Sequence, residues 1–192
     1  MSLFPIALKL NDRRCLVVGA GKVGTEKIFG LVDAGALVHV VDPAPSKAVR
    51  EMAWAGQIEL RHGEYRVCDL ASVFLAVAAT SNADLNRRIF EDALARGILV
   101  NVVDVPELCD FYYPATIRRG ALTVAVSTEG ESPILAQRLR DEISDLLPEE
   151  FEEAVARIGS ERRRILATYE PGEHRRQLLR DLVYPLRAER FA

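Results

Sequence analysis

The chain has 192 residues, of which 49% are hydrophobic and 28% are charged, and its formal net charge is −3. This composition is typical of a globular protein with one or two domains, and the slightly acidic balance argues against a nucleic-acid binder. No apolar run reaches the roughly 18 residues of a membrane helix, and residues 1–10 do not resemble a secretion signal. The three cysteines show no CxxC spacing, which indicates reduced thiols. We therefore expect a cytoplasmic protein.

The first elements of the chain predict a βαβ unit. An alternating segment, Phe4–Leu10, suggests a short edge strand. An apolar run over residues 15–18 then leads into a glycine-rich turn and an amphipathic helix over 22–34. A second apolar run ends at Asp42. This order places a GxGxxG fingerprint in the first turn, as in dinucleotide-binding proteins.

Each glycine of the fingerprint has its own task. Gly19 allows a sharp turn after the strand, Gly21 lets the backbone approach a pyrophosphate, and Gly24 permits close packing of helix on strand. The free N–H groups at the helix start can bind that pyrophosphate. The predicted cofactor contacts of this unit are Gly19, Gly21, Lys22, Val23, Gly24, Asp42, Pro43 and Ala44.

The acid at the end of the second strand predicts which dinucleotide binds. Asp42 follows Gly19 by 23 residues, where a carboxylate can accept hydrogen bonds from both ribose hydroxyls and would repel a 2′-phosphate. We therefore predict NAD as the cofactor. Lys47 and Arg50 lie close by in the sequence and leave NADP open as the alternative.

Strand and helix patterns continue to alternate as far as Asp104. The predicted elements are a helix from the N-cap Ser46 to about residue 55, strands over 58–62 and 73–79, a helix from Ser81 or Asn82 to about residue 96, and a strand over 98–103. Thr80, Asn101 and Val102, in or after these strands, are further predicted cofactor contacts. The alternation predicts an α/β fold with a doubly wound, parallel Rossmann-type sheet.

The pattern changes after Asp104. Short runs over 111–113, 115–118 and 122–127 predict strands without intervening helices, and helices are predicted over 133–147, 151–169 and 173–187, the first of them capped by Ser132. We therefore expect an NAD-binding Rossmann domain over residues 1–110, a small central α+β region over 111–147 and a C-terminal helical domain over 148–192.

Two stretches indicate a family. The first is Asn101-Val102-Val103-Asp104, and the second, Leu122–Ala136, reads LTVAVSTEGESPILA. Together with the glycine fingerprint and the Ala78-Ala79-Thr80 strand end, they resemble, over about residues 1–150, the siroheme synthase family. This family includes precorrin-2 dehydrogenases, some of which are also sirohydrochlorin ferrochelatases. The chain is similar to the stand-alone dehydrogenase type, although Thr128, Glu129 and Glu131 replace smaller or uncharged residues in the second stretch.

The resemblance implies an NAD-dependent oxidation of the tetrapyrrole precorrin-2 to sirohydrochlorin by a homodimer joined through its central region. Ferrous iron would be a further substrate if the chain is also a ferrochelatase. The key acid of the family falls on Asp104, which we predict to be the general base, because open α/β sheets bind ligands at the carboxyl ends of their strands. A carboxylate beside a bound polyanion would also have a raised pKa, which suits proton exchange near neutrality.

The loop before the predicted helix at Ser132 is the candidate site for the substrate's carboxylates, since a helix N-terminus presents free N–H groups. Arginines nearby can add bidentate contacts. The predicted substrate contacts are Ser127, Ser132, Pro133, Arg118 and Arg138. No group of histidines, cysteines and acids has metal-ligand spacing, so we predict no resident metal.

Two other functions remain open at this point. An NAD-sensing regulatory domain would carry the same βαβ fingerprint and strand-end acid, but it would give Asp104 no catalytic task. A small dehydrogenase for another substrate is the second alternative. Its common Tyr-x-x-x-Lys pair is not found here, because neither Tyr112 nor Tyr113 has a lysine four residues on.

Overall fold

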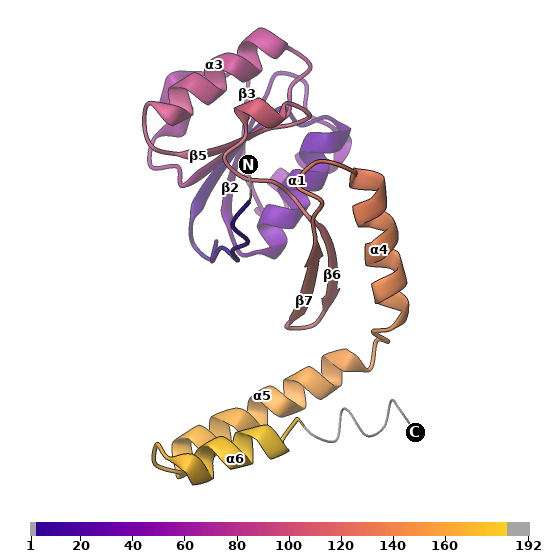
Figure 1. Cartoon of the computed structure of the whole chain (residues 1–192). Coiled ribbons are helices and arrows are strands. Elements are labelled where there is room, and N and C mark those ends of the chain that lie inside the picture. The colour runs from indigo at the N-terminus through magenta and orange to yellow at the C-terminus, as the bar shows by residue number, and fades with distance from the viewer. Residues whose placement is uncertain (1–2, 184–192) are drawn as a thin grey trace. The chain divides into compact units, whose positions relative to one another are not determined.

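A computed structural model describes residues 3–183 of the chain (Figure 1). Its internal contacts divide the protein into two compact units, Met1–Tyr113 and Pro114–Ala192. Within the described residues, no helix combines the length and the hydrophobicity that crossing a bilayer would require.

Five parallel strands form the sheet of the first unit, in the order β3-β2-β1-β4-β5. This confirms the predicted Rossmann-type sheet. The strand order reverses at β1, and in such sheets ligands bind at the carboxyl ends of the strands beside the reversal. The strands are β1 (Arg14–Val18), β2 (Leu37–Asp42), β3 (Glu59–His62), β4 (Leu75–Ala78) and β5 (Leu99–Val102).

Helices cover both faces of this sheet (Figure 1). Successive side chains of a strand point to opposite faces, so Cys15 and Val17 of β1 pack towards α1 and α2. Leu16 and Val18 pack towards α3 on the other face. Burial on both faces explains the unbroken apolar sequence of the central strands. The helical elements are α1 (Lys22–Asp33), α2 (Lys47–Trp54), η1 (Val67–Leu70), α3 (Ala83–Leu94) and η2 (Pro106–Leu108).

Two helices of this unit begin at the predicted side-chain caps. The Ser46 hydroxyl accepts the Val49 N–H at 3.3 Å at the start of α2. The Asn82 side chain accepts the Leu85 N–H at 3.0 Å at the start of α3. Each cap satisfies one of the N–H groups that a helix start leaves without a partner.

Two predicted strands are wrong. Residues 4–10 form no strand, because their alternation covers no core: the side chains of Phe4 and Ile6 are 86% and 64% exposed. Residues 111–113 also lie outside any strand. Their rings pack locally instead, with Phe111 and Tyr113 in edge-to-face contact at 5.5 Å and the ammonium of Lys27 4.1 Å from the Tyr113 ring centre.

As far as residue 183, the second unit contains an antiparallel hairpin and three helices. Ile117 pairs with Val124 in the hairpin, and α4 packs against both of its strands. Arg119 fixes the end of α4, since its guanidinium donates to the carbonyl of Leu147 and to the hydroxyl of Ser144. The last predicted helix ends at Asp181, earlier than expected, and residues 184–192 lie outside the described residues. The elements are β6 (Ala115–Arg119), β7 (Leu122–Val126), α4 (Pro133–Asp145), α5 (Phe151–Thr168) and α6 (Glu173–Asp181).

Candidate functional site

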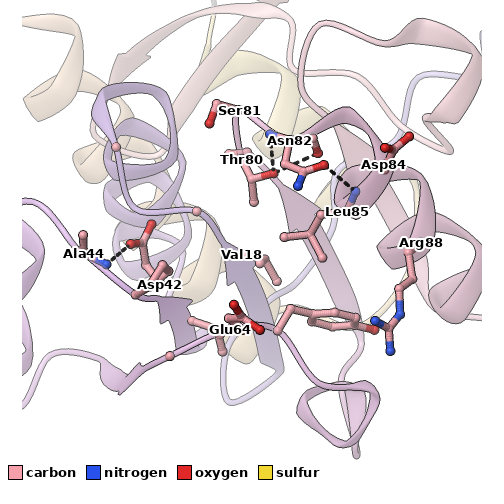
Figure 2. Close-up of a pocket in the computed structure, with 17 residues that line it drawn as sticks. Val18, Asp42, Ala44, Glu64, Thr80, Ser81, Asn82, Asp84, Leu85 and Arg88 are labelled. Carbon is pink, nitrogen blue, oxygen red and sulfur yellow. Dashed lines mark hydrogen bonds between the residues drawn. The ribbon is translucent and has the colours of Figure 1, made fainter.

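A cleft of about 770 Å³ opens at the carboxyl edge of the parallel sheet, where the strand order reverses (Figure 2). In Figure 2, Asp42 and Ala44 lie on one side of the cleft, and Asp84 and Arg88 lie on the other. The lining residues are Val18, Gly19, Gly21, Val41, Asp42, Pro43, Ala44, Gly63, Glu64, Tyr65, Ala79, Thr80, Ser81, Asn82, Asp84, Leu85 and Arg88.

The three fingerprint glycines differ in what surrounds them. A Cβ on Gly19 would lie 2.5 Å from the carbonyl oxygen of Ala79, and a Cβ on Gly24 would lie 1.9 Å from that of Gly19. A Cβ on Gly21 would meet nothing within 4 Å. Gly19 and Gly24 therefore allow the loop to pack against its own sheet, whereas Gly21 presents open backbone to the cleft, as a pyrophosphate site requires.

The helix that follows the loop begins without a side-chain cap. Gly21 is the N-cap of α1 and offers no side-chain acceptor, so an anion can bind the first N–H groups of the helix. The predicted contacts Lys22, Val23 and Gly24 occupy this first turn. None of the three lines the cleft, so their contact with the cofactor stays a prediction.

Asp42 ties the glycine loop to the end of β2. Its carboxylate accepts the Ala20 N–H at 2.6 Å and the Ala44 N–H at 2.6 Å. The Ser46 N–H donates to the Ala20 carbonyl at 3.1 Å, and the hydroxyls of Ser46 and Thr25 lie 3.1 Å apart. These bonds fix the carboxylate at the cleft edge, and its remaining lone pairs can still accept hydroxyl groups.

A buried asparagine holds the wall formed after β4. Asn86, on α3, is 7% exposed. Its amide nitrogen donates to the Thr80 carbonyl at 3.0 Å, and its amide oxygen accepts the Thr80 hydroxyl at 2.6 Å. Thr80 lines the cleft, and its side chain is held by a partner that the sequence pattern did not indicate.

The far end of the cleft contains residues that sequence reasoning missed. Tyr65, just after β3, is 5% exposed, and its hydroxyl donates to Asp92 at 3.0 Å. The Arg88 guanidinium lies 6.0 Å from the centre of the Tyr65 ring. Burial, and then the Asp92 carboxylate, raise the pKa of Tyr65. Glu64 and Leu85 also line this end. The rule that strand ends meet at one edge could have identified residues 63–65.

Asp104 lies two residues beyond β5 and is exposed. The Val103 N–H still bonds to the Ala78 carbonyl of β4 at 3.0 Å, so Asp104 emerges at the carboxyl edge beside the strand that leads to Thr80. Its φ of +62° lies in the left-handed region. Asn101 and Val102 are buried in β5 and do not line the cleft, so their contact with the cofactor stays a prediction.

The predicted substrate residues all belong to the second unit. The hydroxyls of Ser127 and Ser132 accept the backbone N–H groups of Glu129 and Leu135, at 3.2 and 3.3 Å. Ser132 is thus the N-cap of α4, as predicted, with Pro133 in the first turn. Arg138 is paired with Glu142 at 2.8 Å, and Arg118 is exposed on β6. Within residues 3–183, no group of three or more histidines, cysteines and acids could hold a metal ion.

Two family models match the chain. A family described as "Putative NAD(P)-binding" covers residues 6–115, and "Sirohaem biosynthesis protein central" covers residues 119–146. The first match assigns NAD(P) binding to the unit that contains the cleft.

The chain is also similar to part of two longer proteins and to one solved structure. It is 37% identical over 182 residues to a siroheme synthase of Methylobacillus flagellatus and 36% identical over 197 residues to one of Acinetobacter baylyi. These alignments cover 95% and 100% of this chain but 39% and 42% of the relatives. Among solved structures, one titled "SirC, precorrin-2 dehydrogenase" superposes with a TM-score of 0.80 and 27% identity, over 94% of this chain and 89% of that one.

Proposed function

Since this chain belongs to the siroheme synthase family and corresponds to the N-terminal region of its members, we propose that it catalyses the NAD-dependent oxidation of precorrin-2 to sirohydrochlorin. One observation carries the proposal: the similarity to a precorrin-2 dehydrogenase extends over both units of the chain, 94% of its length. An NAD sensor or an unrelated dehydrogenase would be expected to share the nucleotide-binding unit alone.

The oxidation removes a hydride and a proton from the macrocycle. When bound, the nicotinamide of NAD accepts the hydride. Asp104 is the group proposed to accept the proton, because its residue is exposed at the same carboxyl edge of the sheet as the cleft, although Asp104 does not itself line the cleft. Its exposure also lets it return the proton to solvent before the next turnover.

Three features favour NAD over NADP. The Asp42 carboxylate lines the cleft, where its negative charge would repel a 2′-phosphate. The two cations that left NADP open already have partners. The Arg50 guanidinium donates to the Pro45 carbonyl, and the Lys47 ammonium lies 3.5 Å from Glu51. A 2′-phosphate would have to compete with these partners for both cations.

The second unit is proposed to bind the substrate's carboxylates around the start of α4. Because Ser127 and Ser132 already accept backbone N–H groups, each hydroxyl still has its proton to donate to a carboxylate. Arg138 would exchange Glu142 for a substrate carboxylate, which matches a guanidinium in bidentate geometry. We further propose that the enzyme is a cytoplasmic homodimer.

The proposal is tested with purified protein, precorrin-2 and NAD, by following NADH absorbance and the sirohydrochlorin spectrum. We expect stoichiometric formation of both products. Asp104→Ala should lower turnover about 10²- to 10⁴-fold, the usual range for a general base, with unchanged NAD affinity. Ferrous ion added afterwards tests chelation through a second spectral change. NAD binding without either product would refute the dehydrogenase and favour the sensor.

A further inference from the structure

The catalytic acid of the proposed function sits in a tight turn. The Val105 N–H bonds to the Val102 carbonyl at 3.2 Å, which closes a four-residue turn over 102–105. Asp104 is the third residue of this turn, with φ +62°, while Val103 is not in the left-handed region. This is the pattern of a type II turn, which favours glycine or asparagine at the third position. An aspartate held there requires support from its surroundings.

That support comes from the Cys109 thiol. Its sulfur lies 3.1 Å from the Val102 carbonyl oxygen and 3.2 Å from the Val105 carbonyl oxygen. These two carbonyls belong to the first and last residues of the turn, so the thiol bridges the two ends between which Asp104 is held. Burial raises the pKa of Cys109, which keeps the thiol protonated and able to donate at neutral pH.

A second side chain orients the thiol. The Asn101 amide nitrogen lies 3.4 Å from the Cys109 sulfur and donates to the Phe111 carbonyl at 2.8 Å. Asn101 and Cys109 also form an isolated antiparallel bridge. Because Asn101 donates to the sulfur, the S–H proton is left to point at the turn carbonyls. Asn101 is 6% exposed and Cys109 is half-buried, so the asparagine end of this arrangement is shielded from water.

We propose that Asn101 and Cys109 are positioning residues that hold the turn over 102–105 and thereby aim the Asp104 carboxylate at the substrate. The inference rests on the proposed function, because it assumes that Asp104 is the base. Asn101, which belongs to the stretch that resembles the family, would thus help to position Asp104, in addition to any contact with the cofactor. It also gives Cys109 a task that is neither nucleophilic nor redox.

The test compares the turnover of single and double variants. Cys109→Ala removes the S–H donor and should lower kcat about ten- to hundredfold, the effect of a misplacement of about 1 Å, while the NAD dissociation constant stays within about twofold. Cys109→Ser keeps a donor and an acceptor and should recover kcat to within about threefold of the wild type. Cys68→Ala removes an exposed free cysteine outside the turn and should change nothing.

If Cys109 acts by positioning Asp104, the double variant gives a stricter test. In the Asp104→Ala background, Cys109→Ala should cause no further loss, because the carboxylate it positions is gone. The acidic limb of the kcat–pH profile should shift in Cys109→Ala and return in Cys109→Ser. A protein that is only less stable would keep the wild-type profile. Should Cys109→Ala fail to fold, Cys109→Val removes the same donor while filling the space.

The outcomes separate the two claims. Unchanged kcat in the Cys109 variants, with turnover lost in Asp104→Ala, overturns the positioning role and leaves the proposed function standing. An equal loss from Cys109→Ala in both backgrounds also overturns it, because the thiol would then act independently of the acid. Full turnover by Asp104→Ala removes the base assignment itself.

Discussion

The choice between NAD and NADP is predicted to depend on Asp42, and Asp42→Asn tests it. The substitution keeps the size of the side chain and removes its charge. In the wild type both carboxylate oxygens accept backbone N–H groups, from Ala20 and Ala44. The side-chain amide of the variant has one acceptor oxygen, so its NH2 group would face one of these two N–H donors. The glycine loop should therefore lose one hydrogen bond to a charged group, or about 1.5–3 kcal/mol of stability.

The effect on cofactor binding differs between NAD and NADP. A ribose hydroxyl that donates to a carboxylate makes a hydrogen bond worth about 1.5–3 kcal/mol, so losing one should weaken NAD binding roughly ten- to hundredfold. NADP binding should be weakened less or strengthened, because the repulsion between the carboxylate and the 2′-phosphate disappears. Damage to the loop lowers both affinities alike and cancels in their ratio. The ratio of the two dissociation constants is therefore the quantity to measure.

Isothermal titration calorimetry of the wild type and of Asp42→Asn with NAD and with NADP gives the ratio of the two dissociation constants directly. We expect the preference for NAD to fall by at least about tenfold in Asp42→Asn. Asp33→Asn is the matched control, since it makes the same chemical change on an exposed acid at the other end of α1. If Asp42→Asn lowers both affinities equally and keeps the ratio, the carboxylate serves only to hold the loop, and the reasoning is refuted.

Three further predictions concern the same unit. Gly24→Ala should lower the free energy of unfolding by about 1–3 kcal/mol, because its Cβ meets the Gly19 carbonyl. Gly21→Ala should leave the free energy of unfolding in chemical denaturation unchanged and should weaken NAD binding in a binding titration. Asn86→Ala should cost about 1–3 kcal/mol and weaken NAD binding, since Thr80 loses its partner; wild-type values in both assays would contradict this. Burial raises the pKa of Cys15 to about 11, so the folded state holds the thiol proton more tightly than the unfolded state. The free energy of unfolding should therefore fall by about 2–3 kcal/mol as the pH rises from about 9 to about 11. Cys15→Ala should remove this pH dependence when unfolding is measured across that range.

Local signals were enough to predict the nucleotide-binding half of the fold. Gly19, Gly21 and Gly24 are spaced within one turn and the start of one helix, and their three environments follow from that spacing. The caps Ser46 and Asn82 act on N–H groups three residues away. Such features depend on neighbours in the sequence, so residue type and spacing identify them.

Residues whose role depends on strand order could not be identified in this way. Tyr65 and Arg88 are 23 residues apart in the sequence and meet because β3 and β4 end at the same edge of the sheet. The predicted strand over 111–113 failed for the same reason, because the Tyr113 ring packs beside Lys27, far away in the sequence.

The strand order also separates the two halves of the proposed chemistry. Asp42 leaves β2 on one side of β1, whereas Asp104 leaves β5 beyond β4 on the other side. Their supports are separate as well: Asp42 is held by the N–H groups of Ala20 and Ala44, and the Asp104 turn by Asn101 and Cys109. Because these networks share no residue, substitutions in one should leave the other intact, so cofactor preference and turnover should respond independently. A change at Asp42 that altered the pH dependence of kcat at saturating cofactor would contradict this separation.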